Sequence, residues 1–269
     1  MSTSYVFKEL VIDENTTLYV DGNSKITVGN GTYDDPKPNA FSLPHISTCP
    51  GATKECMSAC YIYGLQNNAP EVYKMYARNE QAMHRILMAG AWSKLAKKAS
   101  DVLSEFIKSE CTDGFRWHVS GDVMNDRYAD WIMTTAGESE PVRNWLYTRS
   151  LGLIERMTEK SCRANNLIIN VSADAENYAE ARSIADEFNL RLCYLTRDGN
   201  VPDDMQKGDV IFPDYSLRGR ELDDPTEHTF WKSLSSDYKK MVCPADFFGQ
   251  SEQHRCGPCK KCLVQKSAT

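Results

Sequence analysis

The chain has 269 residues, of which 41% are hydrophobic, and a net charge of −6. This suffices for one large α/β domain with appended segments, and the negative charge excludes a global attraction to polyanions. The longest apolar stretch, Ile86 to Trp92, is too short to span a bilayer, and the N-terminus lacks the pattern of a signal peptide. We therefore expect a cytoplasmic protein without a membrane partner.

The first 39 residues predict a small antiparallel β meander. Three short β-prone runs, Tyr5 to Ile12, Thr17 to Val20 and Lys25 to Val28, are separated by turn-forming residues. We expect residues 1–39 to form this meander, residues 40–240 to form the main β/α domain, and residues 241–269 to form a cysteine-rich C-terminal segment.

A first cysteine group follows the meander. Cys49, Cys56 and Cys60 have the spacing Cys-x6-Cys-x3-Cys, and Tyr61 comes directly after them. A structural zinc site fills four positions, whereas an iron–sulfur cluster held by three cysteines leaves one iron open to a ligand. The group therefore favours such a cluster. His45 would complete a zinc site if it is not a packing residue.

The main domain predicts helices alternating with strands. The pattern is helical from Pro70 to about Ser109. Five β-prone runs follow at the spacing of βαβ units, which indicates a parallel sheet. They are Phe115 to Ser120, Trp145 to Thr148, Leu167 to Ser172, Leu192 to Thr196 and Gly208 to Phe212.

Polar and charged residues end four of these strands, with Ser-x-Asp and Thr-Arg endings in alternation. The carboxyl ends of parallel strands meet at one edge of the sheet, where α/β proteins bind ligands. Helix capping explains the serines and aspartates but not two arginines in matching places. The predicted cofactor-binding residues are Ser120, Gly121, Asp122, Arg149, Ser172, Asp174 and Arg197. Four aromatic or histidine residues lie near these strand ends, and we expect most of them to pack in the core, with pocket lining as the alternative. They are Trp117, His118, Tyr147 and Tyr194.

A second cysteine group lies near the C-terminus and consists of Cys243, Cys256, Cys259 and Cys262. The last three have the spacing Cys-x2-Cys-x2-Cys, and a proline follows the remote Cys243. Iron–sulfur sites and zinc sites both use Cys-x2-Cys pairs. Seven clustered cysteines divide into three and four, which fits one cluster with an open iron and one fully ligated cluster. Two zinc sites would need an eighth ligand, for which His45 or His254 is near. The isolated cysteines are expected to pack in the core: Cys111, Cys162 and Cys193.

The cysteine loop before a long helix and a series of βα units resembles radical SAM enzymes, and more narrowly a group of phage and mobile-element proteins related to them. The spacing differs from the Cys-x3-Cys-x2-Cys that is usual in radical SAM enzymes. The resemblance covers residues 40–262 and implies a partial (β/α) barrel-like parallel sheet. It also implies a [4Fe-4S] cluster on the first cysteine group, whose open iron binds S-adenosylmethionine, and an auxiliary cluster on the second.

The same resemblance implies roles for the strand ends. Ser120, Gly121 and Asp122 would receive the methionine amino group of S-adenosylmethionine, and Arg149 or Arg197 would pair with its carboxylate. The sequence identifies no catalytic residue.

The leading hypothesis is an iron–sulfur enzyme that reductively cleaves S-adenosylmethionine to start radical chemistry on a nucleotide, nucleic acid or small metabolite. Its electron donor would be a protein such as flavodoxin or ferredoxin, and a phage-encoded enzyme would act in the host cytoplasm. One alternative is an iron–sulfur redox protein without catalysis. The other is a zinc-stabilised nucleic-acid-binding accessory protein. Its phosphate contacts would come from basic residues that otherwise form a solvated tail: His254, Arg255, Lys260, Lys261 and Lys266.

Overall fold

The computed structural model describes residues 7–22, 38–90, 92–111, 114–159, 164–249, 251 and 253–266. One sheet runs through the protein, with eight strands in the order β1 to β8. Strands β1 (Phe7–Asp13) and β2 (Thr16–Asp21) form an antiparallel hairpin, and β2 pairs antiparallel with β3 (Ala40–Phe41). The first two predicted strands are thus present and belong to the main sheet. The third predicted run, Lys25 to Val28, lies outside the described residues.

From β3 onward, neighbouring strands are parallel, and each pairs with the strand before it in the chain. Every crossover therefore moves one place in the same direction. Val242 adds one further parallel bridge beside β8, to Ile211. The predicted α/β class and parallel sheet are confirmed. The strands are β4 (Phe115–Trp117), β5 (Asn144–Thr148), β6 (Leu167–Ala173), β7 (Arg191–Thr196) and β8 (Val210–Pro213).

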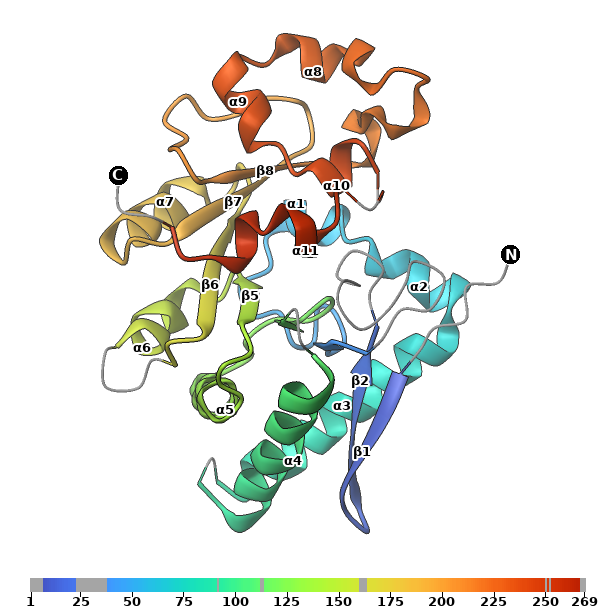
Figure 1. The fold of residues 1–269 in the computed structure, drawn as a ribbon, viewed down its shortest axis with the longest axis vertical. Coiled ribbons are helices and arrows are strands. Elements are labelled where there is room, and N and C mark those ends of the chain that lie inside the picture. Colours follow the sequence, from blue (N-terminus) through green and yellow to red (C-terminus); the bar gives the residue numbers. More distant parts are fainter. Residues whose placement is uncertain are drawn as a thin grey trace.

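Helices connect the strands and surround one side of the sheet (Figure 1). Those between β3 and β8 are α1 (Lys54–Ser58), α2 (Ile62–Asn68), α3 (Pro70–Met88), α4 (Lys94–Glu110), α5 (Asp126–Glu138), α6 (Ile154–Thr158) and α7 (Tyr178–Glu187). Those after β8 are α8 (Thr229–Ser233), α9 (Ser236–Met241), α10 (Pro244–Phe247) and α11 (Cys256–Cys259). Short 3-10 turns are η1 (Leu151–Leu153), η2 (Tyr215–Leu217), η3 (Gly219–Glu221), η4 (Pro225–Glu227) and η5 (Lys261–Leu263).

The predicted helical stretch from Pro70 to Ser109 forms two helices, α3 and α4. Gly90 has a φ of +102°, a left-handed conformation that ends the first helix without steric cost. The Ser93 side chain accepts a hydrogen bond from the Ala96 N–H (3.1 Å) and so caps the second helix. The chain can therefore reverse direction between them.

The two faces of the parallel sheet contact two different cores, because successive residues of a strand point to opposite sides. One set packs against the helices in the main core and includes Phe41, Leu146, Ile169, Leu192 and Ile211. The alternate set forms a smaller core with residues of the C-terminal segment and consists of Ala40, Val119, Trp145, Ile168, Cys193, Val210, Cys262 and Leu263. The C-terminal segment therefore covers the face opposite to the helices, which we call the inner face of the sheet. The red ribbon of this segment lies in front of the sheet in Figure 1.

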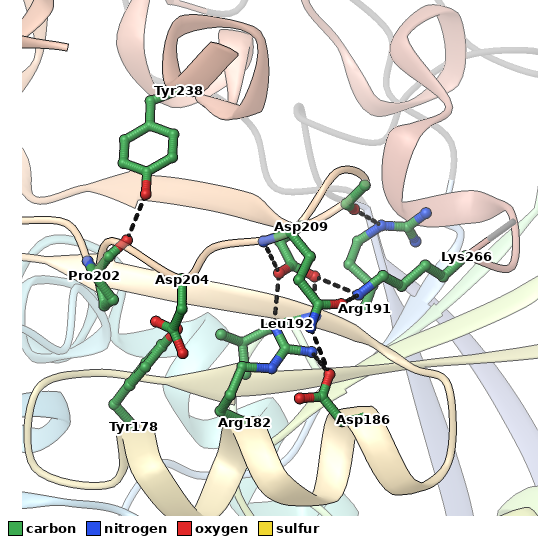
Figure 2. Close-up of polar contacts among 12 residues, drawn as sticks. Tyr178, Arg182, Asp186, Arg191, Leu192, Pro202, Asp204, Asp209, Tyr238 and Lys266 are labelled. Carbon is green, nitrogen blue, oxygen red and sulfur yellow. Dashed lines mark hydrogen bonds and ion pairs between the residues drawn. The ribbon is translucent and has the colours of Figure 1, made fainter. Parts of the chain in front are cut away.

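The end of the C-terminal segment is fixed around the buried carboxylate of Asp209, just before β8 (Figure 2). This carboxylate accepts hydrogen bonds from Arg182 Nη1 (2.7 Å) and Lys266 Nζ (3.0 Å). Arg191 Nη1, at the start of β7, donates to the Val264 carbonyl (2.9 Å). We call these five residues the C-terminal clamp. It holds residues 264–266 against the amino ends of β7 and β8.

Asp21 at the end of β2 is a second buried carboxylate. It accepts hydrogen bonds from Ser42 Oγ (3.1 Å) and Tyr76 OH (3.0 Å). Burial raises its pKa from 3.8 to about 7, because two hydroxyl donors replace the lost water only in part. Asp21 therefore opposes folding when it is charged.

We expect Asp21→Asn to change how stability depends on pH. The folded pKa of about 7 lies above the unfolded value of 3.8, so the wild type loses stability as pH rises from about 4 to 7. Asparagine keeps an acceptor for Tyr76 and carries no charge. Between pH 5 and pH 8 the variant should gain about 2–3 kcal/mol of unfolding free energy relative to the wild type, at about 1.4 kcal/mol per pKa unit. Urea unfolding at both pH values measures this, and an identical pH dependence of the two proteins would contradict it.

Candidate functional site

A cavity of about 430 Å³ lies between the inner face of the sheet, the first cysteine group and the C-terminal segment. Seven cysteines line it: Cys56 and Cys60 from the first group, Cys193 from β7, and Cys243, Cys256, Cys259 and Cys262 from the second group. The strands contribute polar and aromatic side chains, namely Arg116, Tyr147, Arg149 and Ser172. Cysteines of both predicted groups therefore share one cavity, although Cys49 is not among the residues that line it.

The first cysteine group lies on a loop that crosses the carboxyl ends of the strands. Thr53 caps α1, since its Oγ1 accepts a hydrogen bond from the Cys56 N–H (2.9 Å). The thiols of Cys49, Cys56 and Cys60 lie close enough to interact electrostatically. Burial raises the pKa of all three, that of Cys49 to about 12, because a thiolate there would lose its water. A bound metal centre would compensate these negative charges, and its binding would release the thiol protons.

Arg149 and Asp174 attach this loop to the sheet. Arg149 Nη1 lies 2.7 Å from Asp174 Oδ2, and the Asp174 side chain is fully buried. The same carboxylate accepts a hydrogen bond from Thr53 Oγ1. The Arg149 guanidinium also lies near the Cys56 thiol, and its positive charge partly offsets the rise in the pKa of Cys56 that burial causes. The two residues, from the ends of β5 and β6, thus contact both the cap of α1 and a candidate metal ligand.

Two further strand-end residues hold α1. Glu176 accepts hydrogen bonds from the backbone N–H groups of Lys54 (3.3 Å) and Glu55 (2.6 Å). Arg197 Nη1 donates to Ser58 Oγ (2.6 Å). Arg197, predicted to bind a cofactor carboxylate, therefore contacts the cysteine loop. Glu176 was not predicted, although its place beside Asp174 at a strand end is the signal that would have found it.

Ser120, Gly121 and Asp122 lie outside the cavity wall and position the chain that leads into the cysteine loop. Gly121 has a φ of +83°, and a Cβ there would lie 2.6 Å from Leu43 Cβ. The buried Asp122 carboxylate accepts hydrogen bonds from the backbone N–H groups of Val123 (2.7 Å) and Arg149 (2.8 Å). Its contact with a methionine amino group stays a prediction. Ser172, by contrast, lines the cavity.

Among the aromatic and histidine residues singled out in the sequence, Tyr147 lines the cavity, and the Arg116 guanidinium lies 5.1 Å from its ring centroid. Three are buried in the protein interior, as preferred for packing residues: Trp117, His118 and Tyr194. His45 is buried against the rings of Tyr63 (4.7 Å) and Tyr73 (5.9 Å), which supports its interpretation as a packing residue.

The second cysteine group gathers near the inner face of β7, and Cys193 belongs to the same group in space. Cys193 and Cys262 belong to the same small core cluster, and both line the cavity beside Tyr147. The neighbouring Cys193 thiol lowers the pKa of the buried Cys262 thiol. Cys193 is buried as predicted but is not isolated. The missed signal was the two-residue period of the strand, which puts Cys193 on the inner face.

Most basic residues of the C-terminal segment are buried or form hydrogen bonds within the protein. Lys266 pairs with Asp209, Lys261 Nζ donates to the Lys240 carbonyl (2.6 Å), and Arg255 is buried. Lys260 is exposed. This segment therefore differs from a solvated tail. Within the described ranges, no three His, Cys, Asp or Glu side chains converge on a position for a single metal ion. None of the described helices is both long and apolar enough to cross a membrane.

Fold and cavity together define a mixed α/β protein in which two cysteine groups share a cavity at a mostly parallel sheet. The chain belongs to the Gene product 88 family, whose model matches residues 16–265. The match includes strands β2 to β8 and both cysteine groups. It agrees with the predicted proximity to phage proteins and provides no link to radical SAM families. No curated protein and no solved structure matches the chain.

The close approach of the cysteine loop to β5 predicts that Gly51→Ala destabilises the protein. A Cβ at Gly51 would lie 1.9 Å from the Arg149 carbonyl oxygen, so the backbone has to move. We expect a loss of at least about 1–3 kcal/mol in unfolding free energy. The control is Gly152→Ala, since a Cβ there meets nothing within 4 Å and should change stability by less than about 0.5 kcal/mol. Equal stability of the two variants in urea unfolding would contradict this contact.

Asp174→Asn should destabilise the protein by about 3–5 kcal/mol, because it leaves the Arg149 charge buried without its partner. Hydrogen exchange should accelerate in α1, whose cap contacts Asp174. Asp237→Asn is the control, since that carboxylate pairs with Lys240 at the surface, where such pairs contribute about 0–1 kcal/mol. Unchanged exchange in α1 would show that the loop is held by other contacts.

Proposed function

We propose that the protein is an iron–sulfur enzyme that reductively cleaves S-adenosylmethionine to start radical chemistry on a second molecule. The observation that carries the proposal is the shared cavity, because it brings cysteines of both groups together beside the carboxyl edge of the sheet, where α/β enzymes bind ligands. Its volume of about 430 Å³ lies within the usual range of small-molecule sites, about 300–1,000 Å³.

The donor set of the first group fits a [4Fe-4S] cluster. Thiolates are the protein ligands that iron–sulfur clusters use, and the thiols of Cys49, Cys56 and Cys60 lie near enough to one another to influence each other's charge. With three protein ligands, a bound cluster supplies an open iron for S-adenosylmethionine and the electron for its cleavage. The second group offers enough thiols for a fully ligated cluster on the same cavity.

The strand order supports a barrel-like interpretation of the sheet. Strands β3 to β8 follow one another in space as they do in the chain. This is the order of a (β/α) barrel, whose active sites lie at the carboxyl edge. The six parallel strands would then form an open part of a barrel, with the C-terminal segment on its inner face.

The cavity's own residues supply recognition. Arg149 is already neutralised by Asp174. Arg116, whose Nε donates to the His118 carbonyl (3.2 Å), has no carboxylate within ion-pair distance in the described part of the chain. A guanidinium pairs well with a carboxylate. We therefore assign Arg116, rather than Arg149 or Arg197, to the carboxylate of S-adenosylmethionine, with Tyr147 supporting its orientation.

The substrate of this proposed reaction is a nucleotide, a nucleic acid or a small metabolite, and the electron donor is a protein such as flavodoxin or ferredoxin. The chain must also keep water out of the cavity, because reactive intermediates would otherwise be lost to side reactions. The C-terminal segment serves this purpose, because it covers the inner face of the sheet.

The test is anaerobic reconstitution with iron and sulfide, followed by quantification of iron, sulfide and zinc in one sample. We expect about eight iron atoms per chain, from two cubanes. With dithionite and S-adenosylmethionine, chromatography should detect 5′-deoxyadenosine. Cys56→Ala should lose about half of the iron and all of this product. Cys111→Ala is the matched control, because its buried thiol donates to the Pro38 carbonyl (3.7 Å) and does not line the cavity.

Other outcomes would favour the alternatives. A colourless protein that retains zinc would support the zinc-stabilised binding protein. A brown protein with both clusters that never yields 5′-deoxyadenosine would contradict the enzyme and favour a redox protein without catalysis.

A further inference from the structure

We infer that Cys193, on strand β7, is a ligand of the metal centre at the C-terminal cysteines. The sequence motif does not contain this ligand, since it lies in a different element from Cys256, Cys259 and Cys262. The inference deepens the proposed function and rests on it for the metal. It concerns a residue that sequence spacing alone assigns to the core.

The contacts of Cys193 point to ligation. Its side chain lies on the cavity wall and packs in the same small core cluster as Cys262 and Leu263. Cys243 and Cys256 pack against the same small cluster of side chains. Thiols from three separate segments of the chain, β7, the start of α10 and the α11–η5 segment, are therefore gathered at one wall.

The register places Cys193 between Val210 of β8 and Ser172 of β6. Val210 is an aliphatic residue of the same cluster, whereas Ser172 lines the cavity. Cys193 therefore lies where the apolar cluster meets the cavity, and it shares this place with the Cys262 thiol. A [4Fe-4S] cluster binds each thiolate through a different iron and accepts four of them, which Cys193 and three of the four C-terminal cysteines would supply.

The approach of Cys262 to β7 is fixed by contacts that need no metal. Asn170 Nδ2, on β6, donates to the Cys262 carbonyl (3.2 Å). The C-terminal clamp holds Val264 and Lys266 just beyond it. Cys193 itself lies on β7, which is paired with a strand on each side. A ligand on such a rigid element is already oriented before the metal binds, which is how precise sites are built.

The experiment uses the Cys56→Ala protein, in which the C-terminal centre is measured alone. After anaerobic reconstitution, Cys56→Ala should hold about four iron atoms per chain. Adding Cys193→Ala should remove at least half of this iron or shift the electron paramagnetic resonance signal of the reduced cluster. Adding Cys111→Ala, a buried cysteine away from the cavity, should change neither.

A packing role is separated from ligation by Cys193→Val. Valine restores an apolar side chain of similar size, so it should rescue a packing defect but not a missing ligand. Cys193→Val in the Cys56→Ala background should therefore resemble Cys193→Ala. Full iron content with an unchanged resonance signal in the valine variant would overturn the inference.

The metal readout keeps this inference separate from the enzymatic proposal. If the wild type yields no 5′-deoxyadenosine but its metal content still depends on Cys193, the ligand assignment stands and the enzymatic proposal fails. If the protein takes up zinc instead of iron, the same variants are compared for zinc, and a loss with Cys193→Val again supports ligation. A protein that retains neither metal would overturn both.

Discussion

The buried ion pair between Arg149 and Asp174 is the contact on which the cysteine loop depends. An isolated charge at this depth is costly, so each residue requires the other. Asp174 also accepts a hydrogen bond from Thr53, whose side chain accepts one from the Cys56 N–H, so the carboxyl ends of β5 and β6 and the start of α1 are joined. The position of a candidate metal ligand is thus set by two strands rather than by the loop itself.

The second cysteine group is placed by an independent set of contacts. The C-terminal clamp around Asp209 binds the end of the chain to the amino ends of β7 and β8. Between this clamp and the bridge at Val242, the segment crosses the inner face of the sheet. One group is therefore attached at the carboxyl edge and the other across the face, and a small molecule in the cavity would contact residues from both.

Several polar strand ends have structural contacts beside the cysteine loop. Asp122, Asp174 and Arg197 all hold the chain near the cysteine loop. The side chains that line the cavity come instead from the inner face, and Arg116 and Tyr147 are examples. Arg149 belongs to both sets, because it lines the cavity and pairs with the carboxylate that holds the cap of α1.

The sequence by itself determined the α/β class, the parallel strands from Phe115 onward and the two cysteine groups, because hydrophobic periodicity and cysteine spacing are local properties. It could not show that Pro70 to Ser109 forms two helices, since this depends on the backbone conformation of Gly90. Only the tertiary structure decided that both cysteine groups share a cavity and that Cys193 lies against Cys262. Contacts between residues so distant in the chain arise from the order of strands and the path of the C-terminal segment across them, and no local pattern encodes either.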